Sequence, residues 1–459
     1  MDSMSKQKLS EIIDFNPSRK IMKGRIAPFI DMAALPVNAR DISDVGEREF
    51  NGSGSKFSDG DTLFARITPC LENGKTAKVS GLGAGIVAHG STEFIVMAAK
   101  EPEYDENFVY YIGRLPEFRS FATARMEGTS GRQRVAWQSI ADFEFDFPEK
   151  EQRRKIGQIL STLDDKIELN RQINQTLEQI AQTIFKSWFV DFEPVKAKIE
   201  AKAALTPTLS QGEREIVVER AAMCAISGKL DPELDQLSPK QYQQLAATAA
   251  LFPDELVESE LRLIPVGWEV SEIGKEVTVV GGGTPSTANP DFWDGEFAWV
   301  TPKDLSRISE KVLTGFERTI TAAGVGKISS GQLPVGVVLL SSRAPIGYLA
   351  LSMIPVSINQ GFIAMICNKR LPNTYALQWA TANLDAIKQR GSGTTFAEIS
   401  KSNFRPMSVL VPGTEVLDSF QQLVMPLYEQ ITASVREAET LATLRDTLLP
   451  KLLSGDLAV

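Results

Sequence analysis

Residues 150–188, KEQRRKIGQILSTLDDKIELNRQINQTLEQIAQTIFKSW, decide the fold of this chain. Apolar side chains recur there at alternating steps of four and three residues, the spacing of a helix that buries a narrow seam against a partner helix. The seam positions are Ile156, Leu160, Leu163, Ile167, Leu177 and Ile184. A helix from Arg153 to Trp188 would be roughly 54 Å long at 1.5 Å per residue. The stretch predicts a long coiled-coil helix, and a helix packed only on its own domain is the alternative.

The same spacing returns 264 residues later, near the end of the chain. The apolar positions of this second copy are Val424, Leu427, Ile431, Leu441 and Leu448, with Arg445 as the one charged residue among them. Asn170 and Asn174 interrupt the first seam, and the second copy is interrupted at the same two places. With two such helices in one chain, the simplest partner for each is the other. Pro426 should kink or reset the first turns of the second helix.

Each helix follows a globular unit. Short apolar runs such as DTLFARI and EFIVMAA, separated by Gly, Ser and Asn clusters, predict a mixed α/β, β-rich unit. The second unit repeats these landmarks: Arg343 answers Arg66, and Phe362 answers Phe94. The predicted parts are a globular unit at 1–148, a helix at 149–200, an acidic and partly helical connector at 201–262, a second unit at 263–412 and a second helix at 413–459.

The composition is that of an ordinary globular protein. The chain has 459 residues, of which 43% are hydrophobic and 23% charged, and it is long enough for several domains. Its net charge of −9 argues against a protein that coats nucleic acid by charge alone, so any DNA binding must use local basic loops. The three cysteines lie far apart, and no apolar run approaches about 18 residues. We expect a cytoplasmic protein without disulfides or membrane association.

Catalytic and cofactor motifs are missing from the sequence. GGGTPSTANP at 281–290 lacks the lysine of a phosphate-binding loop. NPDF at 289–292 matches the NPPY-type motif of adenine methyltransferases only superficially, and no glycine-rich cofactor motif precedes it. His89 is the only histidine, which argues against a His/Cys zinc site and against histidine base catalysis, and we expect it at a turn or on the surface. We therefore predict no catalytic residue, no metal site and no cofactor.

One loop, GTSGRQRV at 128–135, has the composition of a nucleic-acid contact. Two glycines allow the backbone to approach a ligand closely, and three polar side chains offer donors that read guanine, adenine or phosphate. These residues are Gly128, Gly131, Arg132, Gln133 and Arg134. A solvated loop that happens to hold two arginines is an equally good interpretation. The counterpart at 391–396, GSGTTF, keeps the glycines and hydroxyls and lacks the arginines.

Together these stretches resemble the specificity subunit of type I restriction-modification systems. IPVGWEV at 264–270, followed by GGGTPSTANPDFWDGEFAWVTPKDLS at 281–306, looks like the opening of that family's target recognition domain. Residues 148–189 resemble its central helix, and LRDTLLPKLLSGDL at 444–457 resembles the end of its distal helix. The resemblance covers nearly the whole chain, although the N-terminal unit lacks the Gly-Trp opening.

The resemblance implies an α+β fold with a pseudo-twofold internal repeat, in which two long antiparallel coiled-coil helices separate two target recognition domains. It implies a non-catalytic subunit whose domains each read one half of a bipartite, asymmetric double-stranded DNA site. The helices would set the half-site spacing and dock two methyltransferase (modification) subunits, and restriction subunits that translocate DNA would complete the assembly. S-adenosylmethionine, ATP and Mg would be bound by those partners.

DNA contacts are then expected from loops of both units. The predicted residues are Arg66, Ser130, Arg132, Gln133 and Arg134 in the first unit and Thr284, Ser286, Lys303, Arg343 and Thr394 in the second. Arg66 and Arg343 stand at matched strand ends and could equally be structural. Two other functions are alternatives: a stand-alone DNA methyltransferase or nuclease, which should carry a cofactor motif, and a coiled-coil scaffold, which would not need two glycine-rich globular units.

Overall fold

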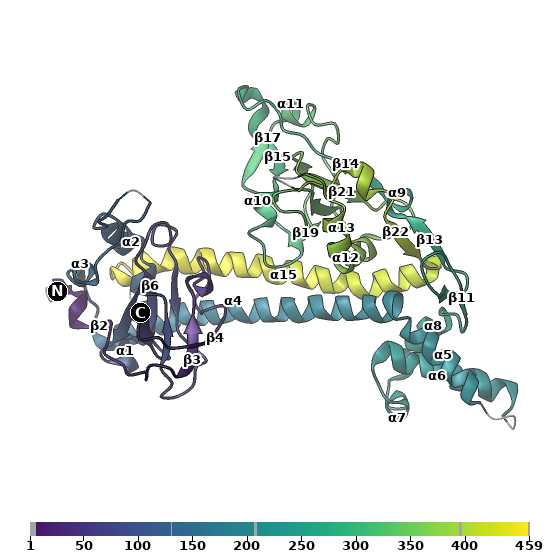
Figure 1. The fold of residues 1–459 in the computed structure, drawn as a ribbon, viewed down its shortest axis with the longest axis horizontal. Coiled ribbons are helices and arrows are strands. Elements are labelled where there is room, and N and C mark those ends of the chain that lie inside the picture. The colour runs from purple at the N-terminus through teal and green to yellow at the C-terminus, as the bar shows by residue number, and fades with distance from the viewer. Residues whose placement is uncertain (1–5, 130, 206–208, 394–396, 458–459) are drawn as a thin grey trace. The chain divides into compact units, whose positions relative to one another are not determined.

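The computed structural model describes residues 6–129, 131–205, 209–393 and 397–457, and its fold is shown in Figure 1. The chain divides into two compact units. Unit 1 comprises residues 1–170 and 437–459, and unit 2 comprises residues 171–436. Two long helices, α4 (Lys150–Phe185) and α15 (Thr414–Leu453), each contribute one end to each unit. Both units are therefore completed by segments of the same two helices.

Unit 1 is built on two four-stranded sheets. The main sheet has the order β2-β9-β6-β7, and all its neighbouring strands are antiparallel. Its strands are β2 (Ile13–Phe15), β9 (Phe94–Ala99), β6 (Thr62–Ala65) and β7 (Thr76–Lys78). The second sheet has the order β4-β3-β8-β5, with β3 and β8 parallel. Its strands are β4 (Gly46–Glu49), β3 (Ile26–Ile30), β8 (Ala88–Gly90) and β5 (Ser55–Phe57).

The main sheet of unit 1 is covered on both faces. Phe64 and Ile95 pack with the helices, whereas Leu63 and Val96 pack with the second sheet, as the two-residue period of a strand requires. The other elements of this unit are β1 (Lys6–Lys8), η1 (Leu9–Glu11), η2 (Met32–Ala34), α1 (Pro102–Arg114), α2 (Pro116–Thr123), α3 (Trp137–Ala141) and β10 (Glu144–Asp146). The expected exposure of His89 is wrong: it lies buried in β8, because the Phe29 and Phe50 rings enclose it.

Unit 2 repeats this plan. Its main sheet has the order β14-β21-β18-β19-β16, and its second sheet has the order β17-β15-β20. The strands are β14 (Thr278–Gly281), β21 (Phe362–Ile366), β18 (Val338–Ser341), β19 (Leu349–Ser352), β16 (Val312–Leu313), β17 (Arg318–Ile320), β15 (Trp293–Val300) and β20 (Ser357–Ile358). Paired strands β13 (Glu269–Glu272) and β22 (Ser408–Val411) answer β1 and β10. The short helices are α9 (Ile273–Glu276), η4 (Pro290–Phe292), α10 (Pro302–Leu305), α11 (Ala322–Val325), α12 (Asn373–Ala382), α13 (Leu384–Gln389) and α14 (Lys401–Phe404).

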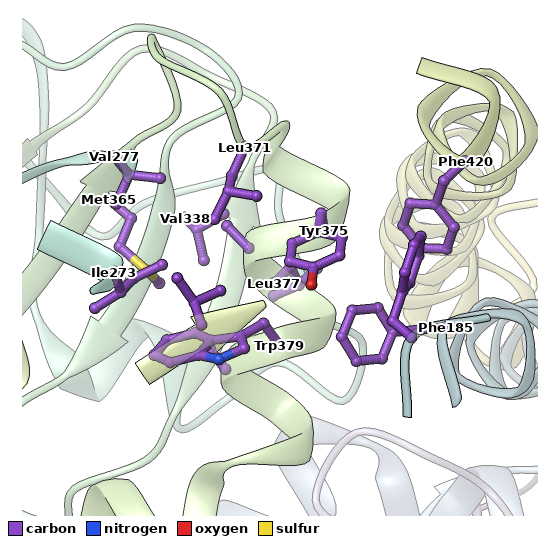
Figure 2. Packing of buried hydrophobic residues seen from close by; sticks show 14 of the residues in the cluster. Phe185, Ile273, Val277, Val338, Met365, Leu371, Tyr375, Leu377, Trp379 and Phe420 are labelled. Atoms are coloured by element: carbon purple, nitrogen blue, oxygen red, sulfur yellow. The ribbon is translucent and has the colours of Figure 1, made fainter. Parts of the chain in front are cut away.

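The core of unit 2 joins its main sheet to the two long helices. Figure 2 shows the Tyr375 ring of α12 between the sheet side chains, such as Val338 and Met365, and the helix side chains Phe185 and Phe420. The Tyr375 and Phe185 ring centroids are 5.2 Å apart, and those of Phe185 and Phe420 are 6.1 Å apart. The short helix α12 therefore fixes the sheet against both α4 and α15.

Strand registers give a residue-by-residue correspondence between the units. Phe94 of β9 pairs with Ala65 of β6, and Phe362 of β21 pairs with Ser341 of β18. The predicted match of Phe94 with Phe362 is therefore confirmed. Because the registers extend along both strand pairs, each residue around them in unit 1 has an identifiable counterpart in unit 2.

The registers also correct one predicted match. The Arg66 amide donates to the Glu93 carbonyl at 3.0 Å, and the Ser342 amide donates to the Gly361 carbonyl at 2.8 Å. Arg66 therefore corresponds to Ser342, and Arg343 lies one position further along the chain. The reason is that GVVLLSSR holds one residue more between its glycine and its arginine than GDTLFAR does.

The two long helices are antiparallel within each unit. In unit 1, Asp164 contacts Arg445 and Asn170 contacts Glu437, so the partner number falls as the α4 number rises. Of the predicted seam residues, Ile156, Leu160, Ile167, Val424 and Ile431 are buried, whereas Leu163, Leu177, Ile184, Leu427, Leu441 and Leu448 are half-buried. The seam holds Asn170 and Asn174, as predicted, but it is more polar than expected because Asp164 is also buried in it.

Helix α15 continues without a break through Pro426, so the expected reset of its first turns is wrong. The proline is exposed, whereas Val424 and Tyr428 beside it are buried. A proline removes one backbone donor, and on the outer face the carbonyl left without that donor can be solvated. Packing of the buried face holds the helix together across the proline.

The connector is more helical than expected. The helix predicted at 149–200 is interrupted, because α4 ends at Phe185, the π-helical turn η3 (Lys186–Val190) follows, and α5 (Glu193–Ala204) begins after Phe192, whose φ angle is 57°. The connector predicted at 201–262 then forms α6 (Gln211–Ser227), α7 (Asp231–Leu234), α8 (Pro239–Ala250), and the strand pair β11 (Leu256–Val257) and β12 (Ile264–Pro265). A small core of Ala222, Met223, Leu234 and Ala249 holds the helices together. Among the described residues, no helix combines the length and the apolarity that a membrane crossing requires.

Candidate nucleic-acid interface

Strand ends bring the predicted loops of each unit to one side of its main sheet. Because β9 is antiparallel to both β2 and β6, the ends of β2 and β6 lie beside the start of β9. The same holds in unit 2 for the ends of β14 and β18 and the start of β21. We call the segments that leave these strand ends the loop edge of each unit.

A glycine-rich hairpin joins the loop edge of unit 1. Glu127 and Arg134 exchange both backbone hydrogen bonds, each 2.9 Å long, and so close the loop. Gly128 and Gly131 have φ angles of 124° and 83°, a region that favours glycine. Arg134 also donates to the Glu93 carboxylate, with Nη2 2.7 Å from Oε1, and this bond raises the pKa of Arg134. The hairpin is thus tied to the loop edge by an ion pair.

The other predicted residues of this hairpin differ in exposure. Arg132 is exposed, and within the described residues it forms no ion pair. Gln133 is half-buried, and its carbonyl accepts a hydrogen bond from the Thr68 amide at 3.1 Å. Ser130 lies outside the described residues. Arg132 is therefore better placed than Arg134 to offer its guanidinium to a ligand.

Arg66 lines a cavity of about 470 Å³ at the loop edge of unit 1, here called the Arg66 cavity. Its walls include Asn16, Arg19, Ser55, Lys56, Arg66 and Thr92. The Arg66 carbonyl accepts a hydrogen bond from the Val135 amide at 3.0 Å, so its backbone is held from both sides. The Arg66 Nε is buried and has no hydrogen-bond partner in the part of the chain that the structure describes. Its position fits a structural role for the backbone and leaves the side chain available.

The loop edge of unit 2 gathers Thr284 and Arg343 around the start of β21. Thr284 Oγ1 donates to Gln360 Oε1 at 2.5 Å. Arg343 follows the residue whose amide bonds the Gly361 carbonyl, and its Nη1 lies 3.6 Å from Glu398 Oε2. This ion pair joins the edge to the second glycine-rich hairpin, as the Arg134 pair does in unit 1. Ser392 and Glu398 exchange both backbone hydrogen bonds, as Glu127 and Arg134 do, so the predicted match between the two hairpins is confirmed in its described part.

Lys303 lies beside the same strand end. A Cβ added to Gly361 would approach the ring of Pro302 to 2.9 Å, which places the start of α10 against β21. Lys303 is exposed, and its Nζ lies 3.4 Å from Glu317 Oε2. Thr394 lies outside the described residues. The segments that carry Thr284, Lys303 and Arg343 thus lie beside the same strand end.

Two tryptophan side chains hold the loop after β14, which carries Ser286, by hydrogen bonds to its backbone. Trp293 Nε1 donates to the Ser286 carbonyl, and Trp299 Nε1 donates to the carbonyl of the last glycine of GGG, each at 3.1 Å. The Arg318 guanidinium lies 3.9 Å from the Trp293 ring centroid. The Ser286 side chain is exposed, so the loop presents it from a fixed backbone.

A basic loop that was not among the predicted DNA contacts follows β2. Residues 16–25, NPSRKIMKGR, hold four cations, namely Arg19, Lys20, Lys23 and Arg25. Lys20, Lys23 and Arg25 are exposed. The run of basic residues was the available signal, and only the strand registers show that it occupies the place of the uncharged loop after β14. In the described part of the chain, no group of His, Cys, Asp and Glu side chains could hold a metal ion.

Comparisons with known proteins agree with this architecture. A family model described as "Type I restriction modification DNA specificity domain" matches residues 66–179 and 265–431. The HindI type I restriction enzyme specificity subunit of Haemophilus influenzae is 31% identical over 410 residues, which cover 87% of this chain and 86% of that protein. The MjaIX specificity subunit of Methanocaldococcus jannaschii is 34% identical over 179 residues, which cover 37% of this chain and 41% of that protein.

A solved structure has the same fold. The S subunit of a type I restriction-modification system from M. genitalium gives a TM-score of 0.51 at 14% identity, over 98% of this chain and 96% of that one. The repeated units and long helices define a two-domain DNA-recognition protein. The chain belongs to the family of DNA specificity subunits of type I restriction-modification systems. It is a non-catalytic component of such a system, and DNA and other subunits of the system are its partners.

Proposed function

We propose that each unit reads one half of a bipartite, asymmetric site in double-stranded DNA through its loop edge. One observation carries this proposal: the loop edges repeat the same backbone hydrogen bonds around Arg66 and Ser342 but carry different side chains. A common backbone with different donors suits the reading of two different base sequences. The predicted DNA contacts of both units stay predictions, with the basic loop at 16–25 added to them.

The long helices set the half-site spacing in this proposal. Both α4 and α15 pass from one unit to the other without interruption. Seven residues added to each helix at the unit boundary would lengthen it by about 10 Å, or roughly three base pairs. The helices are thus a continuous connection whose length the spacing of the half-sites should follow.

The helices also dock two copies of a modification subunit in this proposal. Large apolar side chains are exposed on α4 at Ile159 and Ile180, with exposed fractions of 39% and 42%. The residues 264 positions later, Leu423 and Leu444, are 46% and 45% exposed on α15. Exposed apolar residues repeated at the same offset suit two equivalent partner surfaces. S-adenosylmethionine, ATP and Mg would be bound by the partner subunits.

The test is to sequence the methylated sites in cells that express this chain with its modification subunit. We insert seven residues in α4 after Asn170 and seven in α15 after Arg436, and a control variant carries seven residues after Gly228 in the connector. The expected result is a site with unchanged half-sites and a gap longer by about three base pairs, and the control keeps the original gap. An unchanged gap in the helix variant would refute the spacer role.

A further inference from the structure

The Arg66 cavity of unit 1 carries more positive charge than its neighbouring carboxylates neutralise. Arg19 is bound to Asp61, with Nη2 2.8 Å from Oδ1, so this cation is already balanced. Glu93 is likewise occupied by Arg134. In the part of the chain that the structure describes, no carboxylate forms an ion pair with Lys56 or Arg66. Two cations therefore face this cavity without a counter-charge.

Both cations are available to a ligand. Arg66 is half-buried, and its Nε–H has no acceptor among the described residues. A buried guanidinium donor without an acceptor is costly, and a shift of the side chain toward a ligand oxygen would relieve that cost. Lys56 is half-buried too, with Nζ 5.2 Å from the Phe50 ring centroid, and no carboxylate of the described residues holds its ammonium group. Asn16 and Thr92 add neutral polar groups to the walls.

The same place in unit 2 has no such charge. The pairing of Leu333 with Val356 corresponds to that of Phe57 with Ala88, so Gln332 stands where unit 1 has Lys56. By the same registers Ser342 replaces Arg66, Gln360 replaces Thr92 and Val337 replaces Asp61. The Ser342 Oγ is buried and likewise lacks a hydrogen-bond partner within the described ranges. Residues 282–290, which follow β14, include no charged residue, whereas the loop after β2 holds four cations.

We propose that the Arg66 cavity binds a phosphate group of the DNA backbone, and that unit 2 lacks the corresponding phosphate site. The proposal rests on the proposed DNA recognition and assigns its electrostatic part unequally. The Arg66 guanidinium and the Lys56 ammonium donate to the phosphate oxygens, a contact that positions the duplex without reading its bases. Unit 2 then makes no phosphate contact at this place, and the part of the salt sensitivity that arises from this contact belongs to unit 1.

The test measures binding of the full chain to a fluorescent duplex of random sequence by anisotropy, at several KCl concentrations. Removing one cation that binds a phosphate should reduce the slope of log K against log salt by about 0.9. We expect this reduction for Arg66→Gln and for Lys56→Gln. The fold loss of affinity between 50 and 200 mM salt should then be about threefold to fourfold smaller in each variant than in the wild-type chain. Lys229→Gln, in the exposed connector, removes the same charge and should leave the slope unchanged.

A gain-of-charge variant guards against a purely structural effect. Gln332 is exposed, so Gln332→Lys should fold and should raise the slope by about 0.9 as it supplies the missing cation of unit 2. Unchanged slopes in both unit 1 variants, with binding retained, would overturn the phosphate site and leave DNA recognition standing. Absence of binding by the wild-type chain at low salt would count against the proposed function itself, and the phosphate site would fall with it.

A separate arm asks whether a free anion is the ligand. Inorganic phosphate is titrated into the full chain and into the Arg66→Gln variant by calorimetry. Phosphate binding that Arg66→Gln abolishes, together with unchanged DNA slopes, would assign the cavity to a free anion and overturn the DNA assignment. Reduced DNA slopes with weak or no binding of inorganic phosphate support the backbone phosphate as the ligand.

Discussion

A buried ion pair in unit 1 offers the sharpest test of how the helices are held. Asp164 Oδ1 of α4 and Arg445 Nη1 of α15 lie 2.5 Å apart, and the two side chains are 2% and 4% exposed. The Tyr111 hydroxyl of α1 donates to the other Asp164 oxygen at 2.6 Å. The burial and the Asp164 charge both raise the pKa of Tyr111, so its hydroxyl stays protonated as a donor. One carboxylate thus joins both long helices to the globular domain of unit 1.

Removing one partner should cost more than removing both. Arg445→Leu leaves a buried carboxylate with Tyr111 as its one remaining side-chain donor among the described residues, and breaking a buried pair in this way costs about 3–5 kcal/mol. Asp164→Leu should cost less, about 1.5–3 kcal/mol, because Arg445 keeps its bond to the exposed Asp446. The double leucine variant removes both charges from an apolar seam, and we expect it to recover most of the stability that Arg445→Leu removes.

Hydrogen–deuterium exchange, measured for individual peptides, reports the loss of stability in each unit separately. A decrease of about 3–5 kcal/mol in stability speeds the slowest amides of α1 by roughly 100-fold to 4,000-fold. Peptides of α12 in unit 2 serve as the internal control and should be unaffected. The reasoning is refuted if Arg445→Leu changes the α1 amides by less than about tenfold, or if the double variant is no more protected than Arg445→Leu.

Three further changes test local features. Pro426→Ala should stabilise unit 2 by about 1–3 kcal/mol in denaturant unfolding, because it restores a helical donor in the middle of α15, and equal stability would contradict this. Gly157→Ala should destabilise unit 1 by about 1–3 kcal/mol, since the new Cβ would lie 2.9 Å from Asn107 Cβ; a neutral result would mean that α1 yields there. Burial raises the pKa of Cys367 to about 12, so at pH 8 this thiol should react more slowly with a thiol reagent than Cys70 does, and equal rates in single-cysteine variants would show otherwise.

The parts of the fold that could be predicted from the sequence are those in which one residue spacing repeats over many turns. The seam of α4 extends over many turns, so an error at any single position did not matter, and the repeat in α15 supported it independently. Polar seam residues were harder to interpret. Arg445 interrupted the apolar seam without an evident reason, because its partner Asp164 is 281 positions away in sequence. A pairing across that separation is visible only once the antiparallel register is known.

The loop edges were predicted in part, for a related physical reason. Gly128 and Gly131 indicated their loop in the sequence, because backbone positions with a positive φ angle are usually occupied by glycine. The Arg134–Glu93 pair leaves none, because it depends on which strand ends meet. Arg66 was matched to the wrong residue for the same reason, since a one-residue difference in strand length is not visible as a change of period.

The divergence of the two halves also bears on which helix pairs with which. Asp164 corresponds in the repeat to Tyr428, and Arg445 corresponds to Ala181. In unit 2, Gln378 Nε2 donates to the Tyr428 hydroxyl at 2.6 Å, so a neutral hydrogen bond stands where unit 1 has the Asp164–Arg445 pair. If α4 paired with the α4 of a second chain, the buried Asp164 would lose its guanidinium partner, at a cost of several kcal/mol. Identical halves would leave such pairings equivalent in energy. The charge pair in one half and the tyrosine in the other therefore favour the pairing of α4 with α15 of the same chain, which keeps two different loop edges on one pair of helices.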